Sequence, residues 1–509
     1  MTAMNRRWKK QKLTPEAQFR ATLDHCSRTK NLFEAISLYE SSDAPTLSLN
    51  NLNSLLYICS NSVSDPETRK PAIEFGFKLF HQNNGNLKPN EATITAVSRL
   101  AAAKGDGDYA FELAKRVKDH GVAPKLRTFS PALICFCDGG MADKAYEVEE
   151  HVQAVGLQLE EPELVALLKV SMEASRLEKV YEYLHKLRVA LRGVNQPAME
   201  LIENWFRENH ATEMGSISLS ENQLKEALLR NGGGWHGLGW LGEGVWIVQR
   251  SNIASDGKCS ACDEQLVCVD IDRAETEKFE QSIASFAMER EAQSNFKEFQ
   301  DWLEKHSDYE TVIDGANIGL YQQNFAEGGF SIEQLDAVVQ EVHNSSKKWP
   351  LVVLHKKRVR SLLEDASKRE LIEEWIDKGI LYGTPYGSND DWYWLYATVK
   401  LKCFLLTNDE MRDHIFALLG SNFFFRWKER HQVRYTFMKG NPKLLMPPLY
   451  SLVIQESVKG SWHVPSAEVA GDERCRTWLC VTRPGSNEAE KVSHNNHVSN
   501  NSCDGGDIF

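Results

Sequence analysis

The chain has 509 residues, of which 42% are hydrophobic and 26% charged, a composition that excludes wholesale disorder and collagen-like architecture. At roughly 150 residues per domain, this length predicts about three domains. The formal net charge of −12 argues, taken whole, against a simple basic nucleic-acid-binding domain. Residues 1–200 carry 26 Lys and Arg against 25 Asp and Glu, whereas residues 201–509 carry 33 against 46. A nearly neutral N-terminal arm therefore precedes an acidic remainder.

The N-terminal tail, residues 1–13, is basic and has no apolar run behind it, so neither a signal peptide nor an organellar transit peptide is expected. Its run Arg6-Arg7-Trp-Lys9-Lys10-Gln-Lys12 fits a nuclear localisation signal and, equally, a solvated basic tail. No stretch of 18 or more apolar residues occurs, so no membrane span is expected. The 11 cysteines are mostly scattered singly, which favours a reducing compartment.

A period of 35 residues runs through the first part of the chain, as the spacing of Val117, Val152 and Leu187 illustrates. Each unit contains two helix-length apolar patterns and ends at a Gly or Pro. Five units are predicted, three of them regular and the first two looser, over residues 14–50, 51–90, 91–125, 126–160 and 161–195. Because one helical hairpin cannot bury both of its faces, the units are expected to stack into a solenoid over residues 14–200.

The period, the paired helices and the Gly121-x-x-Pro124 ending resemble pentatricopeptide repeats, and the Trp/Leu/Gly/Tyr signature of tetratricopeptide repeats is missing. The resemblance implies that the concave face binds single-stranded RNA, with small polar residues on each first helix reading bases. Asn53, Thr95 and Ser130 occupy such positions. A protein-binding solenoid is the alternative, and the three residues fit ordinary exposed helix positions equally well.

A C-x₂-C knuckle, Cys259-Ser-Ala-Cys262, lies between candidate strands at 244–249 and 265–271. Structural zinc needs four soft or borderline ligands in a tetrahedron. No second C-x₂-C occurs nearby, so the missing pair must be distant, and the candidates are His463, Cys475 and Cys480. Two thiols without a metal are the alternative, whereas a thioredoxin-type motif is disfavoured because no strand-then-helix context follows.

Residues 274–306 are predicted to form one long helix, and residues 307–450 alternate strand and helix. The predicted strands are 309–313, 350–355, 380–382 and 403–406, and the predicted helices between them are 331–345, 359–378 and 391–402. Strands separated by helices imply a parallel sheet with helices on both faces. The tail 484–509 is rich in Asn, Ser and Gly and is expected to be disordered.

Acidic residues follow three of these strands, at the edge where an open parallel sheet binds its ligands. Asp314 ends the first strand, Asp390-Asp391 begins the helix after the third, and Asp409 follows the fourth. Four converging carboxylates repel one another without a cation, and hard oxygen ligands suit Mg²⁺, with Mn²⁺ as a substitute. Each acid alone also fits a helix cap or a turn. Three strand-end positions together favour a metal site that activates water against a phosphodiester.

Substrate phosphates need cations, and two basic runs in this region are candidates to supply them. The first contains Lys356, Lys357 and Arg358; the second contains Arg426 and Arg430 beside aromatic residues on which bases can stack. A solvated charged face is the alternative for both runs.

Together, the three parts resemble protein-only ribonuclease P, in which pentatricopeptide repeats are joined through a split zinc-binding module to an NYN/PIN-like metallonuclease domain. The motifs that carry the resemblance are Asp314-Gly-Ala-Asn317, Asn389-Asp390-Asp391-Trp392, Thr407-Asn408-Asp409, Cys259-x-x-Cys262, Trp462-His463-Val-Pro and Trp478-Leu-Cys480. It implies that Asp314, Asp390, Asp391 and Asp409 hold the catalytic metal. It also implies that the zinc ligands are Cys259, Cys262, His463 and Cys480.

On this resemblance the repeats are followed by a split zinc module, 201–273 plus 451–483, that flanks a nuclease domain at 274–450. The expected activity is Mg²⁺-dependent removal of the 5′ leader of precursor tRNA by a monomer that requires no RNA subunit and contacts no membrane. The N-terminus lacks a transit-like leader, which suggests a nuclear form. The alternative is an RNA- or protein-binding solenoid whose α/β domain is catalytically silent.

Overall fold

The computed structural model describes residues 14–41, 47–83, 87–213, 215, 219–270, 273–290, 296–323, 329–411, 422–468 and 476–483. The chain divides into two compact units, Met1–Ala190 and Leu191–Phe509. None of the described helices is long and apolar enough to cross a membrane.

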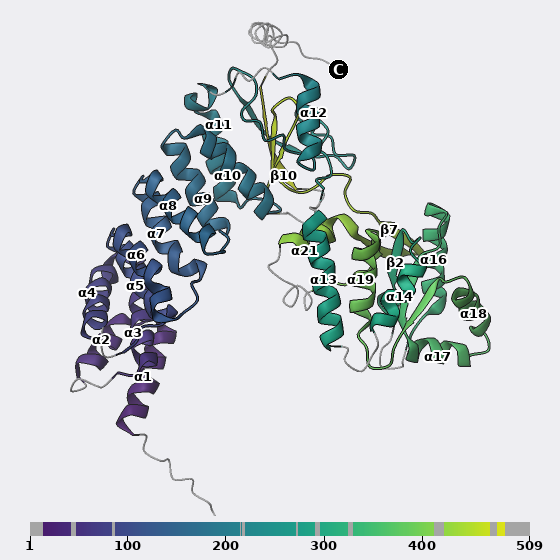
Figure 1. The fold of residues 1–509 in the computed structure, drawn as a ribbon, viewed down its shortest axis with the longest axis horizontal. Coiled ribbons are helices and arrows are strands. Elements are labelled where there is room, and N and C mark those ends of the chain that lie inside the picture. Colours follow the sequence, from purple (N-terminus) through teal and green to yellow (C-terminus); the bar gives the residue numbers. More distant parts are fainter. Residues whose placement is uncertain are drawn as a thin grey trace, which may run out of the picture. The chain divides into compact units, whose positions relative to one another are not determined.

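The first unit consists of helices that pair along the chain (Figure 1). The pairs are α1 (Pro15–Thr29) with α2 (Leu32–Ser41), α3 (Leu49–Asn61) with α4 (Pro66–Asn83), α5 (Glu91–Ala103) with α6 (Gly107–Lys115) and the 3₁₀ helix η1 (Arg116–His120), α7 (Leu126–Asp138) with α8 (Ala142–Ala154), and α9 (Glu161–Glu173) with α10 (Leu177–Ala190). Helices α5, α7 and α9 begin 35 residues apart, as the period predicts.

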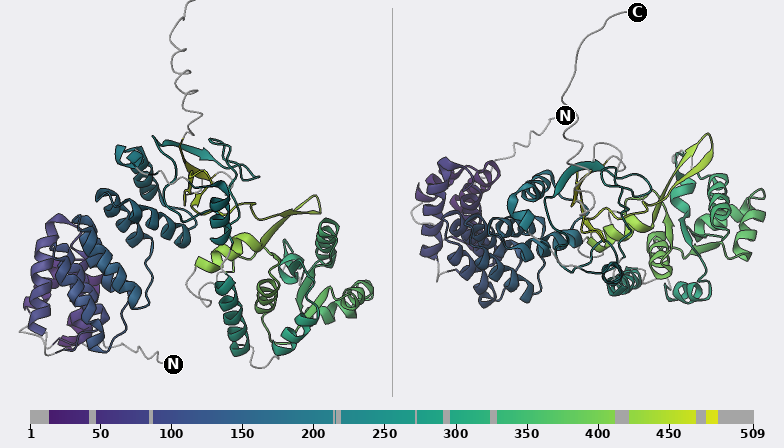
Figure 2. Two further views of the ribbon diagram at one scale, coloured as in Figure 1. Left: turned by 45° about the horizontal axis from the view of Figure 1, so that its top comes forward. Right: turned by 90° about the horizontal axis from the view of Figure 1, so that it is seen from above.

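The helical pairs stack because each leaves an apolar face for the next. The first helices α1, α3, α5, α7 and α9 contact one another in chain order, and Figure 2 shows the stack from two further sides. Their inward residues Leu55, Val97, Leu133 and Leu167 are fully buried. The predicted solenoid of pentatricopeptide type is therefore confirmed.

The second unit begins with a small antiparallel sheet assembled from two distant parts of the chain. Its strand order is β1-β10-β9-β8. The strands are β1 (Ile247–Asn252), β8 (Gln455–Glu456), β9 (Trp462–Pro465) and β10 (Thr477–Thr482), and the helices before them are α11 (Gln196–Arg207), the 3₁₀ helix η2 (Asn209–Glu213) and α12 (Glu221–Arg230). Helix α11 contacts β1 and β10, so the predicted end of the solenoid at residue 200 falls inside a helix that packs on this sheet.

The strand predicted at 265–271 is wrong for its described residues. Only the isolated bridge between Lys258 and Gln265 forms there. The segment is instead fastened by side chains: the Val267 amide donates to Gln455 Oε1 (3.0 Å) and the Val269 amide to Ser451 Oγ (2.9 Å).

The larger sheet has six strands in the order β4-β3-β2-β5-β6-β7. They are β2 (Thr311–Asp314), β3 (Leu351–His355), β4 (Leu381–Thr384), β5 (Phe404–Leu406), β6 (Gln432–Met438) and β7 (Asn441–Leu445). The first five are parallel and β7 pairs antiparallel with β6. The parallel sheet is as predicted, although the β6–β7 hairpin was not foreseen.

Helices cover both faces of this sheet because successive strand residues point to opposite sides. Val312, Leu351 and Leu405 pack with α13 (Arg273–Arg290), α14 (Phe296–Lys305), α19 (Asp390–Leu401) and α21 (Asn422–His431). Their neighbours Ile313, Val352 and Leu406 pack on the other face. The helices there are α15 (Gly315–Leu320), α16 (Ile332–Ser346), α17 (Lys356–Glu364) and α18 (Arg369–Asp377).

The helix predicted at 359–378 is divided into the end of α17 and all of α18. Residues 274–306 contain α13 and α14, and residues 291–295 between them lie outside the described residues. Between α17 and α18, Asp365 Oδ1 accepts hydrogen bonds from the amide (3.0 Å) and hydroxyl (2.7 Å) of Ser367. This local turn competes with helical hydrogen bonding and ends α17.

Candidate metal centres

The predicted carboxylates lie at the carboxyl edge of the larger sheet. From β2 the chain moves outward to β3 and β4, and then crosses to β5 on the other side of β2. Ligand sites of open parallel sheets lie at such a reversal of strand order. Asp314 ends β2, Asp390 and Asp391 begin α19 after β4, and Asp409 follows β5.

Asp314 is buried, with 4% of its surface exposed. Its Oδ1 accepts from the Asn317 amide (3.0 Å), which caps α15, and its Oδ2 accepts from the Thr407 hydroxyl (3.0 Å). Burial raises the pKa of Asp314 to about 7, and the nearby carboxylates of Asp391 and Asp390 add to the rise. Both donors to this carboxylate are neutral groups. A bound cation would supply the positive charge that neither donor brings to the ionised Asp314.

Asp390 is held in a similar way on the other side of the site. The hydroxyl of Thr384, the last residue of β4, donates to Asp390 Oδ1. Burial raises the pKa of Asp390, whereas the Thr384 hydrogen bond and the neighbouring His355 oppose that rise. Thr384 and Thr407 are both fully buried, so two hydroxyl groups each fix one carboxylate.

Asp409 is connected to Asp314 through Thr407. The Asp409 amide donates to Thr407 Oγ1 (3.0 Å), and Asp409 Oδ1 accepts from the Met411 amide (2.9 Å). The four acids therefore share one edge, with Asp314, Asp390 and Asp391 electrostatically coupled and Asp409 joined by a hydrogen bond.

Behind these acids, a network of amides holds the strand ends together. Asn317 Oδ1 accepts from the Asn408 amide (3.0 Å) and from the Tyr435 hydroxyl (2.7 Å), and the Tyr435 amide donates to Asn408 Oδ1 (3.1 Å). Thr384, Thr407 and Tyr435 were not among the predicted site residues. The sequence could have indicated the two threonines, because each lies at or directly after the end of a strand and shortly before one of the predicted aspartates.

The oxygen donors at this edge fit a hard divalent cation. Carboxylates that bind Mg²⁺ usually leave several water ligands in place. Within the described residues, the aspartates do not form a group of three with ligand atoms within 4.8 Å of one another. This looser spacing suits an open site in which water and substrate complete the coordination.

The predicted phosphate-binding cations fall into two classes. Lys356 and Lys357 are exposed at the first turn of α17, beside the acids, and the Arg358 guanidinium lies over the Phe330 ring (4.7 Å). Arg426 instead pairs with Glu275 (2.9 Å), and Arg430 donates to the Val269 carbonyl (2.8 Å). The second basic run thus has structural partners, which leaves the first run as the better candidate for RNA.

The predicted base-reading residues of the solenoid make hydrogen bonds between repeats. Asn53 Oδ1 accepts from the Thr93 hydroxyl (2.6 Å), Thr95 Oγ1 lies 3.1 Å from Thr128 Oγ1, and the Ser130 hydroxyl donates to Glu163. Thr95 is only 6% exposed. These contacts join neighbouring repeats, so base reading by these residues stays a prediction and Thr95 is its weakest candidate.

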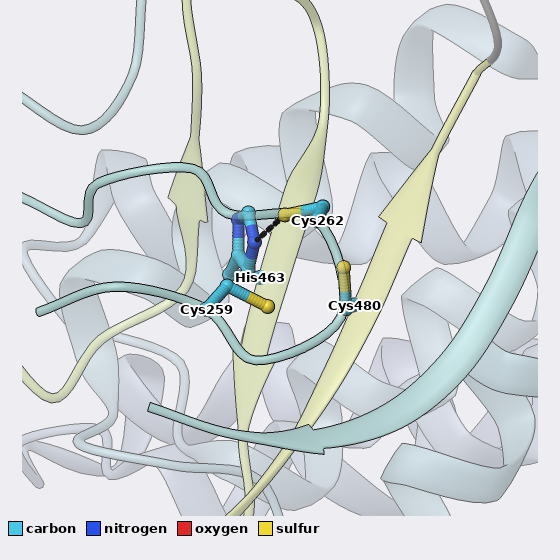
Figure 3. A group of neighbouring side chains, drawn as sticks. All are labelled: Cys259, Cys262, His463 and Cys480. Atoms are coloured by element: carbon cyan, nitrogen blue, oxygen red, sulfur yellow. Dashed lines mark hydrogen bonds between the residues drawn. The ribbon is translucent and has the colours of Figure 1, made fainter. Parts of the chain in front are cut away.

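The predicted zinc ligands converge in the small sheet (Figure 3). His463 on β9 faces Cys480 on β10 directly across the antiparallel pair, and the knuckle loop brings Cys259 and Cys262 over them. The ligand atoms of all four lie within 4.8 Å of one another. The fifth candidate, Cys475, lies outside the described residues.

Three sulfurs and one imidazole nitrogen are a donor set that structural zinc prefers. Tetrahedral ligands with bonds near 2.3 Å are about 3.8 Å apart, and Cys262 Sγ lies 3.3 Å from His463 Nε2. Hydrogen bonds within the cluster lower the pKa of the Cys259 thiol, which favours a thiolate there, and raise the pKa of Cys480. Cys259, His463 and Cys480 are buried and Cys262 is half-buried, so most of the cluster is shielded from solvent.

Comparisons with known proteins identify relatives over most of the chain. A family model described as the pentacotripeptide-repeat region of PRORP matches residues 6–213, and one described as protein-only RNase P matches residues 253–480. The chain is 53% identical to proteinaceous RNase P 2 of Arabidopsis thaliana over 93% of both chains, and 46% identical to its chloroplastic/mitochondrial proteinaceous RNase P 1 over 92% of this chain and 83% of that one.

The fold has a solved counterpart. The crystal structure of nuclear proteinaceous RNase P 2 from A. thaliana matches with a TM-score of 0.81 at 53% identity, covering 93% of this chain and 100% of that one. This chain belongs to the protein-only ribonuclease P family.

Proposed function

We propose that this chain is a Mg²⁺-dependent endoribonuclease that removes the 5′ leader from precursor tRNA and leaves a 5′ phosphate on the mature tRNA. The observation that carries the proposal is the acidic edge of the larger sheet, where Asp314, Asp390, Asp391 and Asp409 meet. Membership of the protein-only ribonuclease P family supports this activity over the alternative of a silent α/β domain.

The residues of the acidic edge have different chemical roles. A divalent cation bound there supplies a Lewis acid that activates water and neutralises phosphate charge. Thr407 and Thr384 fix Asp314 and Asp390, and thereby orient the carboxylate oxygens that hold the cation.

Asp391 and Asp409 are only partly buried. Their carboxylates accept the proton from the water that attacks phosphorus. The bond to the 3′ oxygen of the leader then breaks, and the phosphate stays on the tRNA.

The cysteine and histidine cluster is proposed to hold one structural Zn²⁺. Its ligands come from a loop, β9 and β10, which are segments on either side of the nuclease fold in the chain. One ion thereby closes the split module. Four protein ligands complete a tetrahedron, which leaves no open position for substrate.

The solenoid is proposed to grip the body of the precursor tRNA, and the protein to act as a monomer without an RNA subunit. Because phosphate contacts release counterions, substrate affinity is expected to fall steeply with salt concentration, and a flat response counts against this arrangement. A nuclear location is proposed from the basic run Arg6–Lys12, which lies outside the described residues.

The proposal is tested by incubating precursor tRNA and Mg²⁺ with the wild type and with the double variant Asp390→Ala, Asp391→Ala. The wild type is expected to release the leader and expose a 5′ phosphate, and the double variant to leave the precursor intact. Thermal unfolding of both proteins checks that the fold is kept. The assignment fails if neither protein cuts the precursor or if both do.

A further inference from the structure

One aromatic ring stands exposed beside the acidic edge. Tyr386 is 57% exposed. Among the residues of the second unit whose side chains the structure describes, it is the one exposed Phe, Tyr or Trp. Nearby aromatic residues such as Tyr393 and Trp394 on α19 are fully buried. The ring of Tyr386 therefore has no role in the core of the domain.

The exposed ring is nevertheless fixed in orientation. It meets the His355 imidazole at a centroid distance of 5.9 Å and an angle of 82°, an edge contact that covers at most one face of either ring. The Arg360 guanidinium lies near the Tyr386 hydroxyl. In the same turn, the Ser388 hydroxyl donates a hydrogen bond to the Pro385 carbonyl (2.6 Å).

The ring also lies next to the catalytic carboxylates. Tyr386 belongs to the short turn that leads from β4 into Asp390, the first residue of α19. His355, which its ring contacts, lies opposite Thr384 in the β3–β4 pair, and the Thr384 hydroxyl donates to Asp390. The exposed Lys356 and Lys357 follow His355 directly. A fixed planar surface, two cations and the proposed metal ligands thus occupy one edge.

We propose that Tyr386 is a stacking platform for an unpaired base of the leader, next to the phosphate that is cut. Proteins hold single-stranded RNA by stacking bases on aromatic rings while cations contact the backbone. The leader fits this chemistry because its bases are single-stranded, whereas the bases on the tRNA side of the cut are paired in the acceptor stem. Tyr386 would thereby set the position of the scissile phosphate over the carboxylates.

The inference rests on the proposed ribonuclease P activity and is tested by coupling a protein change to a substrate change. The variant Tyr386→Ala removes the platform, and precursors with an abasic ribose at the last or the second-last leader position remove the base. Tyr386→Phe keeps the ring. Ile376→Ala is the control, because Ile376 is similarly exposed (46%) but lies at the end of α18, just before β4 begins.

With the intact leader, Tyr386→Ala is expected to lower kcat/KM by about 5- to 150-fold, the range found when one stacked base loses its aromatic partner. Tyr386→Phe and Ile376→Ala are expected to stay within about threefold of the wild type. One abasic precursor is expected to cost the wild type a similar factor but to cost Tyr386→Ala almost nothing further.

The stacking proposal is overturned if Tyr386→Ala and the wild type lose the same factor on both abasic precursors. It is also overturned if Tyr386→Phe is as slow as Tyr386→Ala, since the ring would then not be the active feature. Neither result touches the proposed activity, which fails separately if the wild type does not cut the intact precursor at all. Unchanged thermal unfolding of the variants excludes loss of fold as the cause.

Discussion

The two candidate metal centres of the second unit differ in how their ligands are held. In the cysteine and histidine cluster, four ligand atoms from three segments lie within 4.8 Å of one another. At the sheet edge the carboxylates are spaced more widely, and Asp314 and Asp390 are held by the neutral hydroxyls of Thr407 and Thr384. The first arrangement is closed and suits an ion that joins parts of the fold. The second leaves room for water and phosphate.

Substitutions at the two centres should therefore have different effects on folding and on catalysis. Removing a ligand from the closed centre should affect folding, because the ion joins segments that are distant in the chain, and two of its ligands, Cys259 and Cys480, belong to the small hydrophobic cluster of this sheet. Removing one from the open centre should affect catalysis and leave the fold intact, because that edge is stabilised by β-strand pairing and apolar packing behind it.

The largest effect is expected from the closed centre. Cys259→Ala should reduce the zinc content from about one ion per chain to near zero, and should unfold the small sheet, since structural zinc contributes on the order of 10 kcal/mol to small domains. Elemental analysis and thermal unfolding measure both changes. Cys268→Ala is the matched control, because this nearby thiol lies outside the cluster. Equal zinc in all three proteins would contradict the closed-centre account.

The next effect is expected at the open centre. Asp314→Asn keeps the shape of the side chain but removes its charge, and should slow leader removal by about a thousandfold, since metal-assisted charge stabilisation contributes several kcal/mol. Its zinc content should not change. Asp308→Asn is the control, because Asp308 is exposed ahead of β2, at the opposite edge of the sheet. Loss of zinc or unfolding in Asp314→Asn would contradict the separate roles of the two centres in folding and in catalysis.

The same aspartate should make the stability of the metal-free protein depend on pH. Burial raises the pKa of Asp314 from 3.8 to about 7, so the folded state binds a proton more tightly than the unfolded chain does. The stabilisation is complete below pH 4 and is lost as the pH rises through 7, by up to about 4 kcal/mol for a shift of this size. Thermal unfolding from pH 5 to 8 should show a fall that is smaller in Asp314→Asn. Identical pH dependence in both proteins would contradict the buried charge.

The smallest effect is expected from the hydroxyls that hold the carboxylates. Thr407→Val and Thr384→Val should each weaken divalent-ion binding about 10- to 100-fold, the usual cost of losing a group that orients a metal ligand. Electron paramagnetic resonance of bound Mn²⁺ measures this without turnover. Thr407→Ser and Thr384→Ser keep the hydroxyl and should bind like the wild type. If serine and valine variants bind alike, the hydroxyls do not orient the ligands.

The sequence predicted the elements whose pattern is local. The 35-residue period predicted the helical pairs that begin at Glu91, Leu126 and Glu161, and the alternation of strand and helix predicted the parallel sheet. The acids were found because carboxyl ends of parallel strands share one edge, so a residue's place after a strand fixes its location.

Features that depend on tertiary contacts were not predictable in the same way. The break between α17 and α18 depends on a side-chain turn at Asp365, which competes with an otherwise helical pattern. The ion pair of Arg426 depends on Glu275, a partner 151 residues away in the sequence. Likewise, the orientation of Tyr386 depends on His355, on a different strand. Such pairings are set by the packed fold and leave no spacing signal in the chain.

The central claim, one closed structural ion and one open catalytic ion, is tested most directly by chelation. The protein is treated with excess EDTA and desalted, and zinc content and leader removal are measured before and after Mg²⁺ is added. About one zinc per chain should be retained, cleavage should stop, and Mg²⁺ alone should restore it. Cleavage that continues without an added divalent ion, or that returns only with zinc, would contradict the account.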